Sequence, residues 1–275
     1  GSTNAKNFFN SQMITFVIIG LALFVIYGIY NRIRKNNTVL PLRFFKSKNF
    51  TAANIGIFLA GIASNGPMLL LPLFFQNTKG FTAVEAGLML IPQGLGMMVT
   101  RPLIGKMIDR MGARPVVLVS LAISLLGTIP FIFVHENTNL IWLGLVLFVR
   151  GMGIGGLQMP MMTDIFIGLD KQDIPGASVG QRIIQNVGSS FGSAVISAVV
   201  TAVVTSEIAG QMTTKLHQLA AMHTNLTPTV IARAKTSVEK AVTLNGYQLG
   251  FLVSSIVLIV IAIPAMFLSQ KKVNK

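Results

Sequence analysis

Seven long apolar stretches, each bounded by polar or turn-forming residues, constrain the fold of this chain more than any other feature. One crossing of a bilayer as an α-helix needs about 20 mainly apolar residues, because the hydrocarbon core is about 30 Å thick. The stretches are Ile14–Tyr30, Ala52–Phe75, Ala86–Ile104, Pro115–Val134, Leu140–Met162, Val179–Val204 and Tyr247–Leu268. They predict an integral membrane protein with about seven transmembrane helices.

The composition supports a membrane location, since 52% of the residues are hydrophobic and only 11% are charged. Backbone amides cannot stay unpaired in lipid, so a spanning chain is either helical or a closed β-barrel. A barrel would need alternating segments of about ten residues, whereas these stretches are longer and continuously apolar. We therefore predict an all-α integral membrane fold.

Basic residues give the chain a formal net charge of +14, and they lie mostly between the apolar stretches. Alternate loops share them unequally, and the richer set includes the clusters 32–48, 101–114 and 271–275. Lys and Arg concentrate on the cytoplasmic side of membrane proteins, so we predict an external N-terminus and a cytoplasmic C-terminus. This topology accounts for the charge, and no nucleic-acid partner is expected.

Residue types that serve catalysis or metal binding are scarce. The chain has no Cys, and His135, His217 and His223 fall in predicted external loops without a nearby set of ligands. It contains no hydrolase elbow, zinc-protease motif, P-loop or dinucleotide fingerprint. We expect neither an enzyme nor a metal site.

The most specific motif is the run 105–114, which reads GKMIDRMGAR and fits the pattern GxxxDRxGxR between two predicted spans. Gly105 permits close helix approach, and Gly112 can adopt the backbone angles of a tight turn. Asp109 can then face a helix N-terminus or a nearby Arg and hold two helices together in one transport state. The candidate gating residues are Gly105, Asp109, Arg110, Gly112 and Arg114. The alternative is a short basic loop without a specific role.

This run resembles the signature loop of the major facilitator superfamily, which lies between the second and third helices of a six-helix lobe. The stretches 71–76, 85–88 and 91–94 are similar to the C-terminal lobe of the fourteen-helix drug/proton antiporter group. The resemblance implies a linking transmembrane helix and a basic cytoplasmic loop in residues 1–50. It implies a C-terminal six-helix transporter lobe in residues 51–275, with the N-terminal lobe missing from this chain. Residues 206–246 are expected to form an external loop, into which two short amphipathic helices fit.

Polar residues inside the spans are candidates for a translocation cavity. Arg150 precedes a glycine run, similar to the family's motif of a buried Arg followed by Gly, although Met152 replaces the usual glutamine. The candidate cavity or buried polar residues are Asn65, Gln93, Arg150, Gln158, Arg182, Gln185 and Asn186, and the expected helix-packing glycines are Gly151, Gly153, Gly155, Gly188 and Gly192. The alternatives are that Arg150 bonds neighbouring carbonyls and that the residues near 182 snorkel into the membrane interface.

None of the predicted spans contains a well-embedded carboxylate, so a proton carrier is expected in the absent lobe. The resemblance implies the C-terminal half of a proton-coupled multidrug exporter in a bacterial cell membrane, working by alternating access. A proton gradient would drive it without a cofactor. Its expected partners are the bilayer, the missing lobe and hydrophobic or cationic small molecules. Two alternatives stay open: half of a dedicated lipid or metabolite exporter or flippase, and a non-transporting scaffold or sensor.

Overall fold

The computed structural model describes residues 11–33, 42–221 and 227–270 of the 275-residue chain. Every regular element in these ranges is helical, which confirms the predicted all-α class. The elements are α1 (Ser11–Ile33), η2 (Leu42–Lys46), α2 (Lys48–Lys79), α3 (Ala83–Leu88), α4 (Ile91–Met111), α5 (Ala113–Thr128), η3 (Ile129–Phe133), α6 (Leu140–Gly155), α7 (Gln158–Ile165), α8 (Ile174–Ala221) and α9 (Pro228–Ala265).

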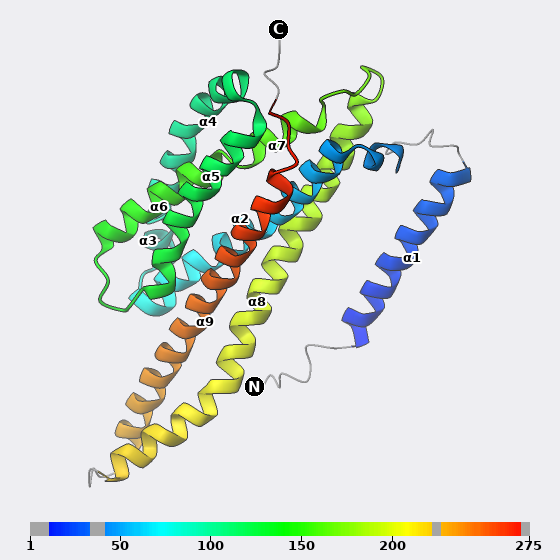
Figure 1. Cartoon of the computed structure of the whole chain (residues 1–275). Coiled ribbons are helices and arrows are strands. Elements are labelled where there is room, and N and C mark those ends of the chain that lie inside the picture. Colours follow the sequence, from blue (N-terminus) through cyan, green and yellow to red (C-terminus); the bar gives the residue numbers. More distant parts are fainter. Residues whose placement is uncertain (1–10, 34–41, 222–226, 271–275) are drawn as a thin grey trace.

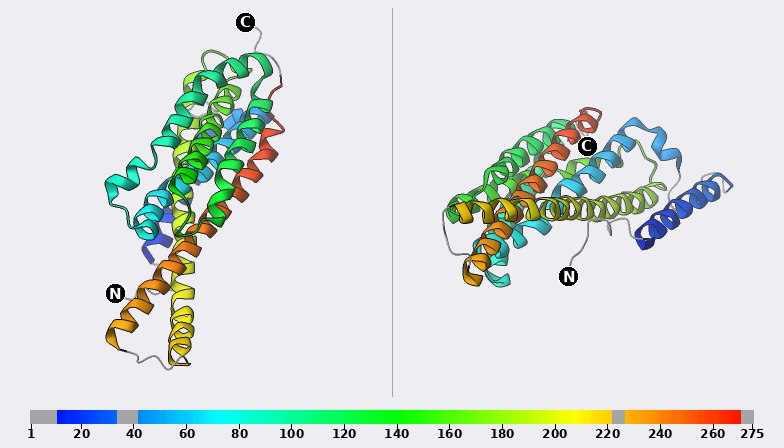
Figure 2. Two further views of the ribbon diagram at one scale, coloured as in Figure 1. Left: turned by 90° about the vertical axis from the view of Figure 1, so that its left-hand side faces the viewer. Right: turned by 90° about the horizontal axis from the view of Figure 1, so that it is seen from below.

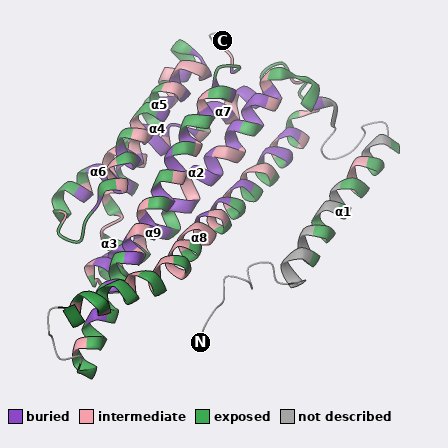
Figure 3. Ribbon diagram, turned by 60° about the horizontal axis from the view of Figure 1, so that its bottom comes forward, coloured by how far each residue is buried: buried purple, intermediate pink, exposed green. Residues whose placement is uncertain are grey.

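Six helical units within the described ranges are long and apolar enough to cross a membrane. Helices α2, α8 and α9 each form one unit, whereas α3 with α4, α5 with η3, and α6 with α7 form the other three. These six units pack as one bundle (Figure 1). The first expected span is α1, whose apolar part Ile18–Tyr30 is shorter than the other six, and α1 stands beside the bundle (Figures 1 and 3).

Capping residues account for several helix boundaries. Gly80 ends α2 in the left-handed conformation, and its N–H bonds back to the last turn. Thr82 and Glu85 form a reciprocal capping box at the start of α3. The Asn139 side chain accepts from the N–H of Ile141 at 2.8 Å and so begins α6. These local signals set the end of α2 and the starts of α3 and α6.

Glycines bring α6 close to both of its neighbours. A Cβ at Gly151 would overlap the backbone of Gln93 in α4, and one at Gly153 would overlap the backbone of Ser124 in α5. Gly155 lies against Met97, and Gly127 of α5 lies against the backbone of Arg150. We call Gly127, Gly151, Gly153 and Gly155 the glycine seam. The seam lets α6 sit between α4 and α5 at backbone contact.

A second close contact joins α2 to α8. A Cβ at Gly188 would overlap the carbonyl oxygen of Phe58, and one at Gly192 would lie 2.5 Å from the Cα of Ile62. Gly61 of α2 lies against the backbone of Ser189 in return. The five glycines expected at helix contacts therefore all lie where another helix approaches. Gly105 does not, because a Cβ there would meet only the Met159 methyl group, at 4.0 Å.

Two large apolar clusters and a small one, Ile104 with Ile108 and Val116, fill the bundle. One gathers Phe50, Ile57, Val117 and Leu258 with their neighbours. The other surrounds a stacked aromatic pair, Phe131 and Phe251, whose ring centroids are 4.8 Å apart. Figure 3 shows the buried positions concentrated in the helices of the bundle, while α1 and the far ends of α8 and α9 are mostly exposed where they are described.

The expected loop at 206–246 is corrected by the structure. Helix α8 continues without a break to Ala221, and α9 already begins at Pro228, so both expected amphipathic helices are extensions of spans. We call residues 206–221 and 228–246 the hairpin; it projects beyond the other helices (Figures 1 and 2). The polarity of this region marks the end of an apolar span but does not end the helix. That the hairpin is external stays a prediction, as does the domain boundary at residue 50.

Candidate translocation cavity

A cavity of about 880 Å³ lies between α2, α4, α7 and α8, with Ile154 and Gly155 of α6 also in its wall. Six of the seven expected polar residues line it: Asn65, Gln93, Gln158, Arg182, Gln185 and Asn186. They come from four helices that are distant in sequence. The structure therefore brings the candidate residues together around one space, except for Arg150, which lies behind it.

Helical periodicity explains why these side chains share a wall. On α8, Arg182, Gln185, Asn186 and Ser189 recur at spacings of three and four residues and so lie on one face. On α4, Gln93, Met97 and Arg101 recur every four residues on another. The break between α6 and α7 places Gln158 at the start of a new helix, in the cavity wall.

Hydrogen bonds join the polar residues across helices. Gln181 donates to the Oε1 of Gln185 at 3.2 Å, and Gln185 donates to the Oε1 of Gln158 at 2.7 Å, which links α8 to α7. Asn65 of α2 donates to the hydroxyl of Ser189 at 2.9 Å. Burying an amide costs less free energy when the amide is hydrogen-bonded than when it has no partner. These bonds therefore stabilise one arrangement of the wall.

Arg150 is fully buried in α6, behind the cavity wall. Its Nη1 donates to the Oε1 of Gln93 on α4 at 3.0 Å, while its Nε and Nη2 have no hydrogen-bond partner among the described residues. The glycine seam makes this pairing possible, because Gly151 lets α6 approach the backbone of Gln93. A side chain on another helix, rather than neighbouring carbonyls, thus receives the guanidinium.

Arg101 is a cavity residue that sequence analysis missed. It was counted with the basic residues of a loop, but it lies inside α4, ten residues before the end of that helix, and lines the cavity. Its spacing of eight residues from Gln93 was the signal that places both on one face. The cavity wall therefore holds two guanidinium groups, those of Arg101 and Arg182.

The motif at 105–114 forms the end of α4 and the turn into α5. Gly112 has a φ of 83°, so the turn uses a backbone conformation that favours glycine. Asp109 and Arg110 are exposed, and within the described ranges Asp109 has neither an ion pair nor a hydrogen bond. Asp109 thus does not join two helices in this conformation, and a gating role for the motif stays a prediction.

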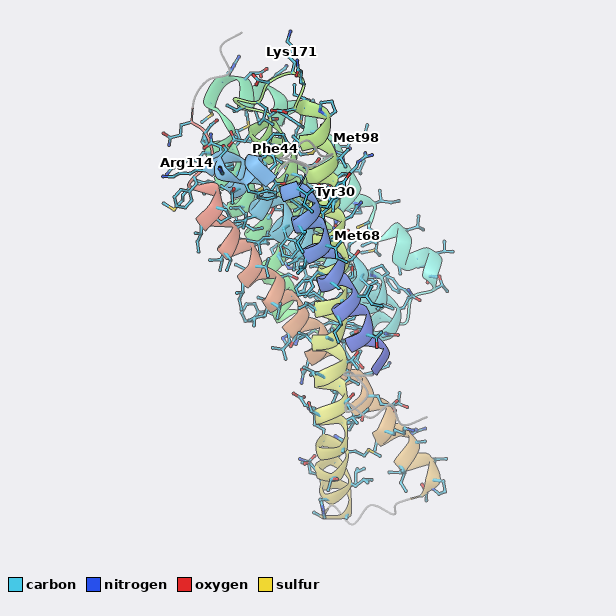
Figure 4. All side chains as sticks on the ribbon, turned by 90° about the vertical axis from the view of Figure 1, so that its right-hand side faces the viewer. Tyr30, Phe44, Met68, Met98, Arg114 and Lys171 are labelled. Carbon is cyan, nitrogen blue, oxygen red and sulfur yellow. The ribbon has the colours of Figure 1, made fainter. Side chains whose placement is uncertain are left out.

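Asp164 lies one residue before the end of α7, and its side chain is fully buried. Its two oxygens accept the N–H of Ser269, at 3.1 and 3.3 Å, and the carbonyl of Ser269 accepts the N–H of Arg114 at 3.2 Å. The segment after α9 therefore ties α7 to the α4–α5 turn. Figure 4 shows Arg114 and Lys171 at the end of the bundle remote from the hairpin.

Six spanning units, four of which line a polar cavity, are typical of the multi-pass membrane proteins to which solute transporters belong. Residues 7–193 match the sequence profile of the Major Facilitator Superfamily, and the chain belongs to this family. It is thus a multi-pass membrane protein of a transporter family.

Similar proteins come from bacteria. The chain is 30% identical over 146 residues to a "Multidrug resistance protein B homolog" of Mycobacterium tuberculosis, a match over 52% of this chain and 27% of that protein. It is 28% identical to the "Multidrug resistance protein Stp" of the same species over 53% of this chain and 26% of that protein. It is 25% identical to the "Uncharacterized MFS-type transporter YhcA" of Bacillus subtilis, over 54% of this chain and 27% of that protein. The matched region thus spans about a quarter of these relatives.

Proposed function

We propose that this chain forms the C-terminal lobe of a proton-coupled exporter of hydrophobic compounds, which works by alternating access against a second lobe. The observation that carries the proposal is the polar cavity on α2, α4, α7 and α8, whose wall is held by hydrogen bonds between helices. The names of the two mycobacterial relatives support drug compounds as the substrate class. The N-terminus then faces outward and the C-terminus lies in the cytoplasm of a bacterial cell.

The chemistry of the wall suits adaptable binding. Four methionines, Met68, Met97, Met159 and Met162, supply flexible apolar surface between the carboxamides. None of the described residues that line the cavity is Asp or Glu. The proposal therefore places the proton-carrying group outside this wall, and a cationic substrate would take its counter-charge from there too.

Transport by the whole natural protein tests the proposal. Inverted membrane vesicles that contain it would receive a proton gradient, and the uptake of neutral, cationic and anionic fluorescent compounds would be followed with and without an uncoupler. Uptake that the uncoupler abolishes is expected. If no compound in the panel enters although the protein is inserted in the membrane, the exporter proposal fails in favour of a dedicated substrate or a non-transporting role.

The gating role proposed for the 105–114 motif has its own test. Exchanging Asp109 for Asn removes the charge of an exposed residue without changing its size. We expect transport to fall by about tenfold, the equivalent of one charge-assisted contact of about 1.4 kcal/mol in one transport state, with membrane abundance near normal. If this variant transports as fast as the natural protein, the motif has no gating role.

A further inference from the structure

The two arginines in the cavity wall lack the acidic partners that membrane-embedded cations usually have. Arg101 and Arg182 line the cavity from α4 and α8, and neither makes an ion pair within the described part of the chain. All eight Asp and Glu residues of the chain lie outside the cavity wall: Glu85, Asp109, Glu136, Asp164, Asp170, Asp173, Glu207 and Glu239. The described wall therefore carries positive charge only.

Both arginines belong to apolar stretches, Arg101 to Ala86–Ile104 and Arg182 to Val179–Val204. Each lies three residues inside the end of its stretch, which is about 4.5 Å at 1.5 Å per residue. Met68 lines the same cavity and lies between the remote ends of the molecule in Figure 4. The arginines thus extend into the span, where an uncompensated cation is costly and a facing anion is favoured.

The surrounding groups reinforce this preference for an anion. Arg150 lies behind the wall and uses the Oε1 of Gln93. The Oε1 atoms of Gln185 and Gln158 accept from amide donors. The guanidinium groups of Arg101 and Arg182 thus stand next to methionine side chains, a combination that fits an acidic group on an apolar body.

We propose that Arg101 and Arg182 form an anion-binding subsite that takes the sulfonate, carboxylate or phosphate group of an amphipathic organic anion. The methionines of the wall contact the apolar part of the same molecule. The inference rests on the proposed transport function, because it names the substrate class of that cavity. It departs from the cationic substrates that the family resemblance implies.

The test compares two probes that share an aromatic skeleton. Anilinonaphthalene sulfonate carries one negative charge, and phenylnaphthylamine is its neutral counterpart. Both would be titrated into nanodiscs that hold the whole natural protein, with empty nanodiscs as the blank. The variants are Arg101→Gln and Arg182→Gln, the conservative variants Arg101→Lys and Arg182→Lys, and the matched control Arg233→Gln, an exposed arginine of the hairpin.

Each Gln variant is expected to weaken sulfonate binding about tenfold, the loss of one charge-assisted contact, with binding of the neutral probe unchanged. The Lys variants should retain part of the affinity, since they keep the charge but lose the planar fork. The Arg233→Gln variant should bind both probes as the natural protein does.

Two results would overturn the inference. Equal losses for both probes would mean that the arginines act only on the shape of the cavity. Unchanged sulfonate binding together with a lowered melting temperature would mean that they pair with carboxylates in another part of the protein. The vesicle assay separates this inference from the proposed function. If the gradient drives uptake but sulfonate binding does not depend on the arginines, only the anion-binding subsite is ruled out. If sulfonate binding depends on the arginines but no compound is taken up, only the transport function is ruled out.

Discussion

The glycine seam and the hairpin both lie in helices, but different interactions stabilise these two regions. In the seam, α6 meets α4 and α5 at backbone contact, and the fully buried Arg150 lies within it. In the hairpin, α8 and α9 are largely exposed, and the buried positions on α9 are Ala234, Val238, Val242, Leu244 and Gly246. The comparison teaches that a glycine in the seam is required by its neighbours, whereas the hairpin depends mainly on the helix-forming tendency of its own residues.

The largest expected difference comes from adding one methyl group in each region. Gly151→Ala places a Cβ into the backbone of Gln93, whereas Gly210→Ala in the hairpin meets nothing within 4 Å. We expect Gly151→Ala to lower the free energy of unfolding by about 3 kcal/mol and Gly210→Ala to raise it by about 0.5–1 kcal/mol. The melting temperatures of the purified variants measure both. Similar shifts of the melting temperature at the two sites would show that the glycine seam and the hairpin do not differ in this way.

The second prediction concerns Arg150 and Gln93, the hydrogen-bonded pair beside the glycine seam. Gln93→Leu removes the one side chain that accepts a hydrogen bond from the buried Arg150 among the described residues, and we expect the free energy of unfolding to fall by about 3 kcal/mol. Arg150→Met removes a buried cation that is only partly satisfied, so stability should stay the same or rise by about 1 kcal/mol.

A double-mutant cycle provides the control for this pair. The variant with both substitutions should be about as stable as Arg150→Met alone, because Gln93 matters chiefly through Arg150. Additive losses from the two single substitutions would show that the two side chains act independently.

Removing a helix cap should have a similar effect on stability in the bundle and in the hairpin, because a cap acts within one turn of its own helix. Asn139 caps α6 in the bundle with an N···O distance of 2.8 Å, and Thr227 caps α9 in the hairpin at 3.4 Å. We expect Asn139→Ala to cost about 1 kcal/mol and Thr227→Ala about 0.5 kcal/mol. Thermal melts of both variants test the order. A larger loss at Thr227 would mean that the hairpin contributes to the stability of the whole bundle.

The smallest effect is expected for the ion pair between Lys235 and Glu239 on the surface of the hairpin. The atoms are 3.8 Å apart and both side chains are largely exposed. Glu239→Gln should therefore change stability by less than about 0.5 kcal/mol, and raising the salt concentration should remove the difference. A loss above about 1 kcal/mol at low salt would contradict this description of the hairpin surface.

The sequence predicted features that depend on periodicity along one helix and missed features that depend on contacts between helices. Arg182, Gln185 and Asn186 share one face of α8, which spacing alone reveals. The bond between Arg150 and Gln93 joins residues 57 positions apart, and no local pattern indicates it. No local pattern indicates the bond between Asp164 and Ser269 either, because the two residues lie 105 positions apart.

The hairpin was misjudged for a different reason. Hydropathy falls near Ser206, but Gln211, Lys215, Leu216 and their neighbours are good helix formers, and Pro228 is the first helix-breaking proline after that point. Polarity reports where an apolar span ends, and helix propensity reports where the helix ends. The two signals differ here by about four turns, so the two expected amphipathic helices continue the spans instead of standing apart from them.

The bond between Asp164 and the N–H of Ser269 has a consequence for which sequences can occupy the segment after α9. The carboxylate accepts a backbone N–H, so any residue at position 269 other than proline can supply this donor. A saturation library at this position should therefore reject proline, which has no N–H to donate, and should favour small side chains because the Ser269 hydroxyl is buried. Position 164, which must supply the carboxylate, should accept almost none.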